Sequence, residues 1–144
     1  MRYVYPARIR THEGTALVTF RDLPEAITEG KDRANAFAQG IDCLDTALLF
    51  RLKEEEAIPE PSPLQRGEVA IPASPAVAAK AAFVRAFREA GLTRVALAAR
   101  IGVAETEIRR MLDPDHVSKI DRLGEGMRAL GRSLVIVDEK AAAA

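Results

Sequence analysis

The first thirty residues alternate imperfectly between apolar and polar positions, a pattern typical of β-strands with one buried face. The segments Tyr3–Arg10 and Ala16–Arg21 are separated by turn-forming residues and are predicted to pair as a hairpin. Pro6 favours an edge position or a bulge for the first strand, because proline cannot donate to a strand ladder. A short third strand is predicted over Ala26–Glu29 and ends at Gly30.

Helical spacing replaces this alternation after Gly30. Asp32 is the predicted N-cap of a long amphipathic helix that runs to about Glu55, because apolar residues recur there at steps of three and four. The apolar stripe of this helix must cover one face of the small sheet. After the proline-rich loop Ile58–Pro63, the run Glu68–Ile71 is predicted as a last strand. A strand–helix–strand return of this kind normally makes a parallel, right-handed crossover.

The second half of the chain is predicted to be mainly helical. Ser74 and Pro75 give a strong start signal for a helix that ends at Gly91. The apolar face of this helix consists of Ala79, Phe83, Phe87 and Ala90. Ser118 is the predicted cap of a later helix, and a β-rich tail, Ser133–Asp138, follows it. Because a lone strand cannot bury itself, the tail should pair with another copy of the chain or with an edge of this one.

Two short helices are predicted on either side of Gly102, within residues 93–112. The apolar residues that recur at helical spacing are Leu97, Ala98 and Ile101 before the glycine, and Ile108, Met111 and Leu112 after it. Gly102 permits a sharp corner, and the small side chain of Ala98 lets the two helices approach closely. This is the pattern of a helix-turn-helix, whose second helix can lie in a DNA major groove. Two-helix corners are common, so the pattern alone indicates only a possible DNA contact.

The second helix of this pair, predicted over Ala104–Leu112, leaves four polar side chains free to face outward. They are Glu105, Thr106, Arg109 and Arg110. Arginine can bind guanine O6 and N7 as a bidentate fork, and threonine can contact a thymine methyl group or a phosphate. A glutamate here could accept from cytosine N4 or could orient an arginine. The alternative is a solvated helix with i,i+4 ion pairs such as Glu105–Arg109.

Residues that flank the helix pair are candidates for phosphate binding. Thr93 and Arg94 open its first helix, and His116, Ser118 and Lys119 lie near the start of the helix that follows. Helix N-termini bind phosphate through their free N–H groups. His116 is equally consistent with a loop histidine that has no partner.

Composition and charge narrow the class of protein. The chain has 144 residues, of which 48% are hydrophobic, so one ordinary domain or two small ones can fold. It has no long apolar run and no secretory signal, and its single cysteine, Cys43, fits a reducing cytoplasm, so we expect a cytoplasmic protein without a membrane span. The net charge is zero overall, but residues 1–72 carry −3 and residues 73–144 carry +3. The first half therefore favours a basic partner and the second a polyanion.

The sequence predicts no catalytic, metal or cofactor site. His12 and His116 have no nearby cysteine or histidine to complete a zinc site. Asp22, Asp42 and Asp45 are not placed at a common strand end as two-metal catalysis would require. No phosphate-cradling glycine loop is present. These observations favour a binding protein over an enzyme.

The order of these segments resembles the HicB family of antitoxins from bacterial type II toxin–antitoxin systems. The segments that carry the resemblance are Val18–Gly30, the helix with Ala36, Gly40 and Ala47–Leu48, the strand Glu68–Pro72, and then Met111–Pro114, His116 and the Leu123–Gly131 helix. The C-terminal segments are similar to the helix-turn-helix variant of the family. The resemblance covers nearly the whole chain, and it depends on the order of the segments more than on any single motif.

The resemblance implies an α+β protein of two domains. Residues 1–72 would be a partial RNase H-like domain without nuclease activity, which covers the active surface of a small basic HicA-type toxin, an mRNA-cleaving RNase. Residues 73–144 would be a helix-turn-helix domain with a terminal β-strand, which forms a dimer or higher oligomer and binds operator DNA to repress the shared operon. Two alternatives stay open: a small RNase H-like nucleic-acid-processing enzyme, and a helix-turn-helix repressor whose N-terminal domain senses a ligand.

Overall fold

Contacts within the chain divide it into two compact units. The computed structural model describes residues 1–141, and residues 142–144, at the end of the predicted second domain, lie outside the described part. The first unit, here called the sheet unit, comprises Met1–Leu48, Pro59–Ser74 and residues 138–141. The second, the helical unit, comprises Leu49–Ile58 and Pro75–Val137. The described residues form a four-stranded sheet and five helices, which confirms the predicted α+β class.

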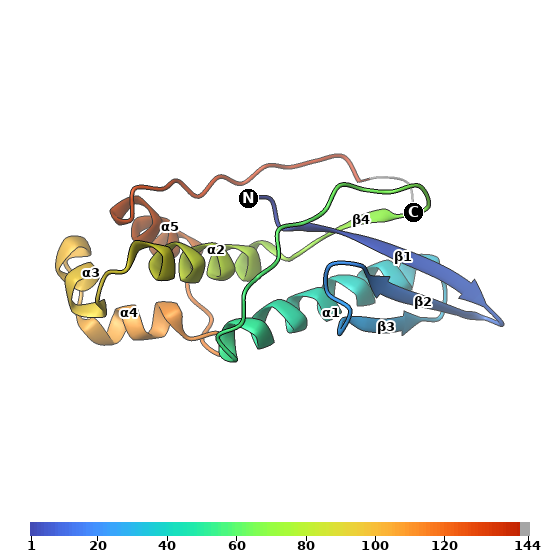
Figure 1. Ribbon diagram of the computed structural model, residues 1–144, viewed down its shortest axis with the longest axis horizontal. Coiled ribbons are helices and arrows are strands. Elements are labelled where there is room, and N and C mark those ends of the chain that lie inside the picture. The colour runs from blue at the N-terminus through green and yellow to red at the C-terminus, as the bar shows by residue number, and fades with distance from the viewer. Residues whose placement is uncertain (142–144) are drawn as a thin grey trace. The chain divides into compact units, whose positions relative to one another are not determined.

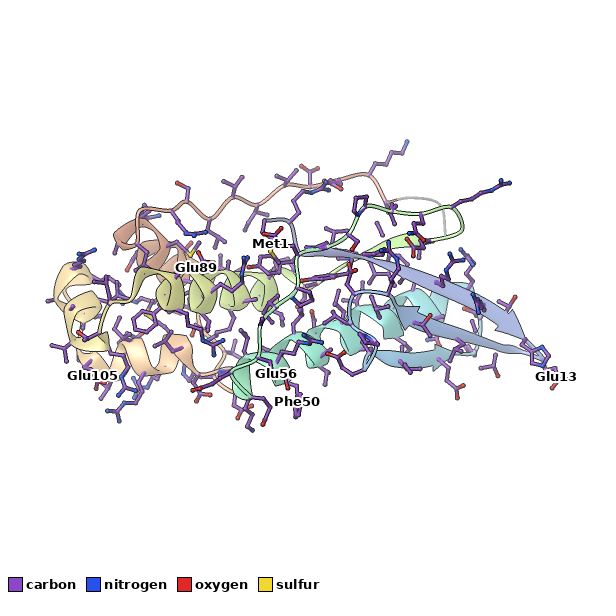
Figure 2. The ribbon with its side chains drawn as sticks, in the orientation of Figure 1. Met1, Glu13, Phe50, Glu56, Glu89 and Glu105 are labelled. Carbon is purple, nitrogen blue, oxygen red and sulfur yellow. The ribbon has the colours of Figure 1, made fainter. Side chains whose placement is uncertain are left out.

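The four strands of the sheet unit are antiparallel to their neighbours (Figure 1). The strands are β1 (Val4–His12), β2 (Thr15–Phe20), β3 (Ile27–Gly30) and β4 (Val69–Pro72), in the spatial order β3-β2-β1-β4. The predicted hairpin is formed by β1 and β2, with His12 opposite Thr15. Glu13 lies at the tip of this hairpin (Figure 2), and both Glu13 and Gly14 have positive φ, as a type I′ turn requires.

β1 has neighbours on both sides, but Pro6 lies just outside its pairing with β2, so the predicted edge position holds on that side of the strand only. β1 pairs with β2 from Ala7 to His12 and with β4 from Val4 to Ala7. At Pro6 itself β1 therefore has only β4 beside it. The N–H that proline lacks removes no hydrogen bond to β2, which explains why the strand tolerates it.

β4 runs antiparallel to β1, so the predicted parallel crossover is wrong. The chain before β4 is held against one end of the sheet by side chains from β1 and from the corner after β2. Tyr5 Oη donates to the Pro59 carbonyl at 2.7 Å, and Asp22 accepts from the Ser62 N–H at 2.7 Å and from its hydroxyl at 2.6 Å. Because these contacts bring the chain back to that end of the sheet, β4 starts beside Ala7 and runs towards Val4.

The long helix α1 (Arg33–Lys53) begins at its predicted cap. Asp32 Oδ1 accepts from the Asn35 N–H at 2.7 Å, and the helix ends two residues before the predicted Glu55. Its backbone approaches the sheet closely at Gly40, where a Cβ atom would lie only 2.8 Å from Ile71 Cδ1. The absence of a side chain at Gly40 therefore lets α1 cover the buried face of the sheet. No helix among the described residues is long and apolar enough to cross a membrane.

The helical unit packs four helices around one apolar core. These are α2 (Pro75–Ala90), α3 (Arg94–Ile101), α4 (Glu105–Leu112) and α5 (Ile120–Ala129). The buried core consists of Ala79, Phe83, Ala86, Leu97, Ala98, Ile108, Met111, Leu123 and Met127. Most of the apolar positions predicted for these helices are confirmed as core or partly buried. Ala90 is the exception: it is exposed, because α2 ends there.

The tail Ser133–Asp138 forms no strand, so the predicted terminal β-strand is wrong for the chain as described. Leu134 packs against the core of the helical unit. Val135, Ile136 and Val137 follow it and are 74%, 67% and 69% exposed. Within residues 1–141 no strand pairs with this segment, so its backbone lacks the ladder partner that a strand needs.

Candidate nucleic-acid interface

The corner between α3 and α4 is built by backbone hydrogen bonds at Gly102. The N–H groups of Gly102 and Val103 both donate to the Ala98 carbonyl, at 2.8 and 3.1 Å. Gly102 has φ 79°, a left-handed conformation that glycine adopts without steric cost. The corner directs Ile108 and Met111 of α4 into the core. The opposite side of α4 is left to its polar residues.

The polar side of α4 carries the residues that the sequence predicts as base contacts. Thr106, Arg109 and Arg110 are exposed, and Glu105 is half-buried. Ala104 is the N-cap of α4 and has no side-chain hydrogen bond to the helix. The two glutamates lie in the first turn and the two arginines in the last, an order that suits the helix dipole.

Glu105 lies at the first turn of α4 (Figure 2), where it joins two arginines from different helices. Its carboxylate is 3.0 Å from Arg94 Nε at the start of α3 and 3.1 Å from a terminal nitrogen of Arg109. The i,i+4 pair that the sequence offered as an alternative to DNA contact is therefore present. Because both arginines are largely exposed, such pairs stabilise the fold by about 1 kcal/mol or less. Their guanidinium groups remain accessible to a stronger acceptor.

Glu107 makes a second bridge, which includes an arginine that the sequence prediction missed. Its carboxylate is 3.7 Å from Arg110 and 3.6 Å from Arg122 of α5. Arg122 also pairs with Glu125 at 2.8 Å. The sequence placed Arg122 only on a later helix, and nothing in its spacing indicated that α5 brings it beside α4.

The predicted phosphate-binding residues fall into two groups. Thr93 is the N-cap of α3, as predicted, and its hydroxyl oxygen accepts from the Ala96 N–H at 3.1 Å. His116, Ser118 and Lys119 lie in the loop between α4 and α5. Ser118 is not the cap of α5: that position is held by Lys119, whose side chain makes no capping hydrogen bond. The Ser118 hydroxyl is instead engaged by a buried lysine.

That lysine is Lys80 of α2, which is 3% exposed and which the sequence prediction also missed. Its Nζ donates to the carbonyls of Arg110 and Met111, at 3.1 and 2.9 Å, and to Ser118 Oγ at 2.8 Å. Burial lowers the pKa of Lys80 to about 8, while the charges of Asp113 and Glu107 oppose the shift. The signal in the sequence was a single lysine within an otherwise apolar stretch of α2, Ala76–Val84.

The other candidate residues, His12 and Cys43, belong to the sheet unit. His12 is exposed on the β1–β2 hairpin. Cys43 on α1 is half-buried, and its burial raises the pKa of the thiol. Among residues 1–141, no three His, Cys, Asp or Glu side chains are grouped so that they could hold a metal ion.

Comparison with known proteins gives consistent matches. A family model described as HicB_like antitoxin of bacterial toxin-antitoxin system matches residues 4–82. The chain is 38% identical to Antitoxin HicB 1 of Photorhabdus laumondii subsp. laumondii over 133 residues, which cover 92% of this chain and 84% of that protein. It is also 38% identical to Antitoxin HicB of Escherichia coli strain K12 over 125 residues, 87% of this chain and 91% of that protein. Antitoxin HicB of Pseudomonas fluorescens is 26% identical over 96% of both chains.

Proposed function

Since the chain belongs to the HicB-like family of antitoxins from bacterial toxin–antitoxin systems, we propose that it neutralises a HicA-type toxin and represses its own operon. The toxin would be a small basic mRNA-cleaving RNase, and the two proteins would meet in the cytoplasm, where mRNA is translated. Neutralisation would occur by occlusion: the antitoxin covers the surface that carries the toxin's catalytic histidine.

We assign toxin binding to the N-terminal domain, residues 1–72, which we take as the partial RNase H-like domain of the family. Its net charge of −3 suits a basic partner. Opposite net charges speed the encounter of two proteins and exclude partners of the wrong sign, although they add less to affinity. Rapid capture is what an antitoxin requires, because free toxin destroys mRNA until it is bound.

We assign operator binding to α3 and α4, which act as the two helices of a helix-turn-helix. The observation that carries this assignment is a group of arginines around α4. Arg109 and Arg110 on the helix and Arg94 of α3 are exposed, and Arg122 of α5 is half-buried beside them. Arg109, Arg110 and Thr106 would contact base edges in the major groove. Arg94, Thr93, His116, Ser118 and Lys119 would contact phosphates on either side.

Glu105 has a positioning role in this proposal. Its carboxylate already holds Arg94 and Arg109 at 3.0 and 3.1 Å, so both guanidinium groups are restrained before DNA arrives. A restrained arginine loses less conformational entropy when it binds guanine. The same carboxylate repels phosphate, which disfavours binding to DNA of the wrong sequence.

We further propose that the functional repressor is a homodimer or higher oligomer joined through the tail. Val135, Ile136 and Val137 are β-branched, consecutive and exposed. Pairing the tail with the tail of a second copy would supply the missing ladder partner and bury these side chains. A dimer places two recognition helices about 34 Å apart on a palindromic operator.

Two substitutions with different expected outcomes test the operator-binding assignment. Arg109→Ala should cost roughly 1–3 kcal/mol on the specific operator and relax the base preference at one position, whereas Lys119→Ala should weaken binding to all sequences alike. Both are measured by fluorescence anisotropy on the duplex upstream of the gene and on a random duplex. Equal losses from both substitutions on both duplexes would refute the assignment of Arg109 to base reading.

A further inference from the structure

We propose that Lys80 is a positioning residue for DNA binding: its ammonium group holds the loop between α4 and α5 so that the Ser118 hydroxyl is turned outward and donates to a DNA phosphate. This inference rests on the proposed operator-binding function of the helical unit. It assigns a role to a residue that is buried and cannot itself touch DNA.

The ammonium group of Lys80 lies at the C-terminal end of α4. The last four carbonyls of a helix have no partner within the helix, and a cation near them is favourable. Lys80 Nζ reaches two of these carbonyls in α4, those of Arg110 and Met111. It therefore fixes the C-terminal end of the proposed recognition helix to α2, the same end that carries Arg109 and Arg110.

The hydrogen bond from Lys80 sets the direction of the Ser118 hydroxyl. An ammonium group has three donors and no acceptor, and all three Lys80 donors are used. Ser118 Oγ must therefore accept from Lys80, and its own hydrogen is left to donate elsewhere. Ser118 Oγ also lies 3.4 Å from Nδ1 of the exposed His116, a long contact in which the ring nitrogen can accept. A phosphate oxygen at that place would be a better acceptor, because it is charged.

Further hydrogen-bond donors lie close to this hydroxyl along the chain. His116 and Lys119 are exposed, and Lys119 is the N-cap of α5, whose first N–H groups are not bonded within the helix. When Ser118 donates to Nδ1, the neutral His116 ring carries its proton on Nε2, which can also donate to an anion. The hydroxyl, the histidine, the lysine and the helix N-terminus thus form a group of donors whose position depends on Lys80.

The pH dependence of DNA binding follows from the same geometry. The charged groups that face Lys80 are Asp113 and Glu107, which favour its charged form, while burial lowers its pKa to about 8. Above that pH the neutral amine has a lone pair and can accept the Ser118 hydrogen, which turns the hydroxyl inward. Affinity for DNA should therefore fall as the pH rises through about 8.

The test compares Ser118→Ala, Lys80→Met and the double variant in the full-length chain, on the duplex upstream of the gene. Each single variant should weaken binding roughly tenfold, since each removes a hydrogen bond to a charged group or its positioning. The double variant should be little weaker than the worse single variant, because both changes break one connection. Lys31→Met, which removes an exposed lysine of the sheet unit, should bind as the wild type does.

A pH series keeps the proposal testable if Lys80→Met does not fold. The DNA affinity of the wild type should fall several-fold more than that of Ser118→Ala between about pH 7 and pH 9.5, because only the wild type has a Ser118 hydroxyl that can turn inward. Parallel pH profiles, or additive effects of the two substitutions, would overturn the proposal for Lys80 and leave operator binding intact. Failure of the wild type to prefer its upstream duplex over random DNA would instead overturn operator binding itself, and this inference with it.

Discussion

Two glycines of α5 offer a controlled test of how the helical unit is packed. Gly124 and Gly126 both lie inside the helix, and both are buried. A Cβ atom at Gly126 would lie 2.5 Å from Phe83 Cε2 and 2.9 Å from Met111 Cε, whereas one at Gly124 would meet only Arg128 at 3.7 Å. Carbon atoms attract one another best at about 3.5–4.0 Å, so the first site is blocked and the second is open.

The change in the free energy of unfolding on each substitution depends on two opposing terms. Replacing glycine by alanine within a helix stabilises it by about 1 kcal/mol at either site. At Gly126 the added methyl group must displace Phe83, which is fully buried, and overpacking of this kind costs about 1–3 kcal/mol. Gly124→Ala should therefore stabilise the protein. Gly126→Ala should be about 1–3 kcal/mol less stable than Gly124→Ala, since the helix-propensity term cancels in that difference.

The assay is urea unfolding of both full-length variants, followed by far-ultraviolet circular dichroism. Because Met111 belongs to α4, Gly126→Ala should also shift the proposed recognition helix and weaken operator binding, while Gly124→Ala should not. Equal free energies of unfolding for the two variants would refute the close approach of α5 to Phe83, and with it the described packing of the helical unit.

Three further predictions concern other parts of the chain. The Arg21 side chain and the Gln65 N–H lower the pKa of Glu68 from its usual 4.5 to about 2. This carboxylate therefore adds stability that is present above about pH 4.5 and is lost as the pH falls towards 2. The stability of Glu68→Gln should fall less steeply with pH in that range, and superimposable acid-unfolding curves for the variant and the wild type would contradict the pairing of Glu68 with Arg21. Ile136→Lys should shift the proposed oligomer towards monomer in sedimentation velocity, whereas Ser133→Lys, which adds the same charge at the start of the tail, should have a smaller effect. Glu105→Gln should raise affinity for random duplex more than for the operator, because it removes a carboxylate that repels phosphate, and an unchanged ratio of the two affinities would argue against its positioning role.

Local signals in the sequence predicted local structure well. Asp32 and Thr93 cap the helices they were expected to cap, because an N-cap depends only on a side chain and an N–H three residues later. The hairpin at Glu13–Gly14 and the corner at Gly102 were also predictable, since both need the left-handed backbone conformation that glycine adopts freely.

Features that depend on distant contacts were not predictable in this way. The direction of β4 depends on Tyr5 and Asp22, which bind a segment some forty or more residues away. Lys80 and Arg122 became candidates only when the fold placed them beside α4. Ser118 resembled a helix cap because serine is common there, yet its hydroxyl is taken by Lys80. The amino acids of the tail favour a β-strand, but a strand also needs a second strand to pair with, and the sequence pattern does not supply one.

The central claim is that this chain neutralises a toxin through one domain and binds DNA through the other. Growth rescue tests this claim most directly. The reading frame next to this gene, which we expect to encode a small basic protein, is expressed in a host cell with the wild-type chain, with Arg109→Ala, or alone. We predict that the neighbouring protein alone arrests growth, and that the wild type and Arg109→Ala restore it equally, because the substitution lies outside the proposed toxin-binding domain. Continued arrest in cells that contain soluble wild-type chain would contradict the account.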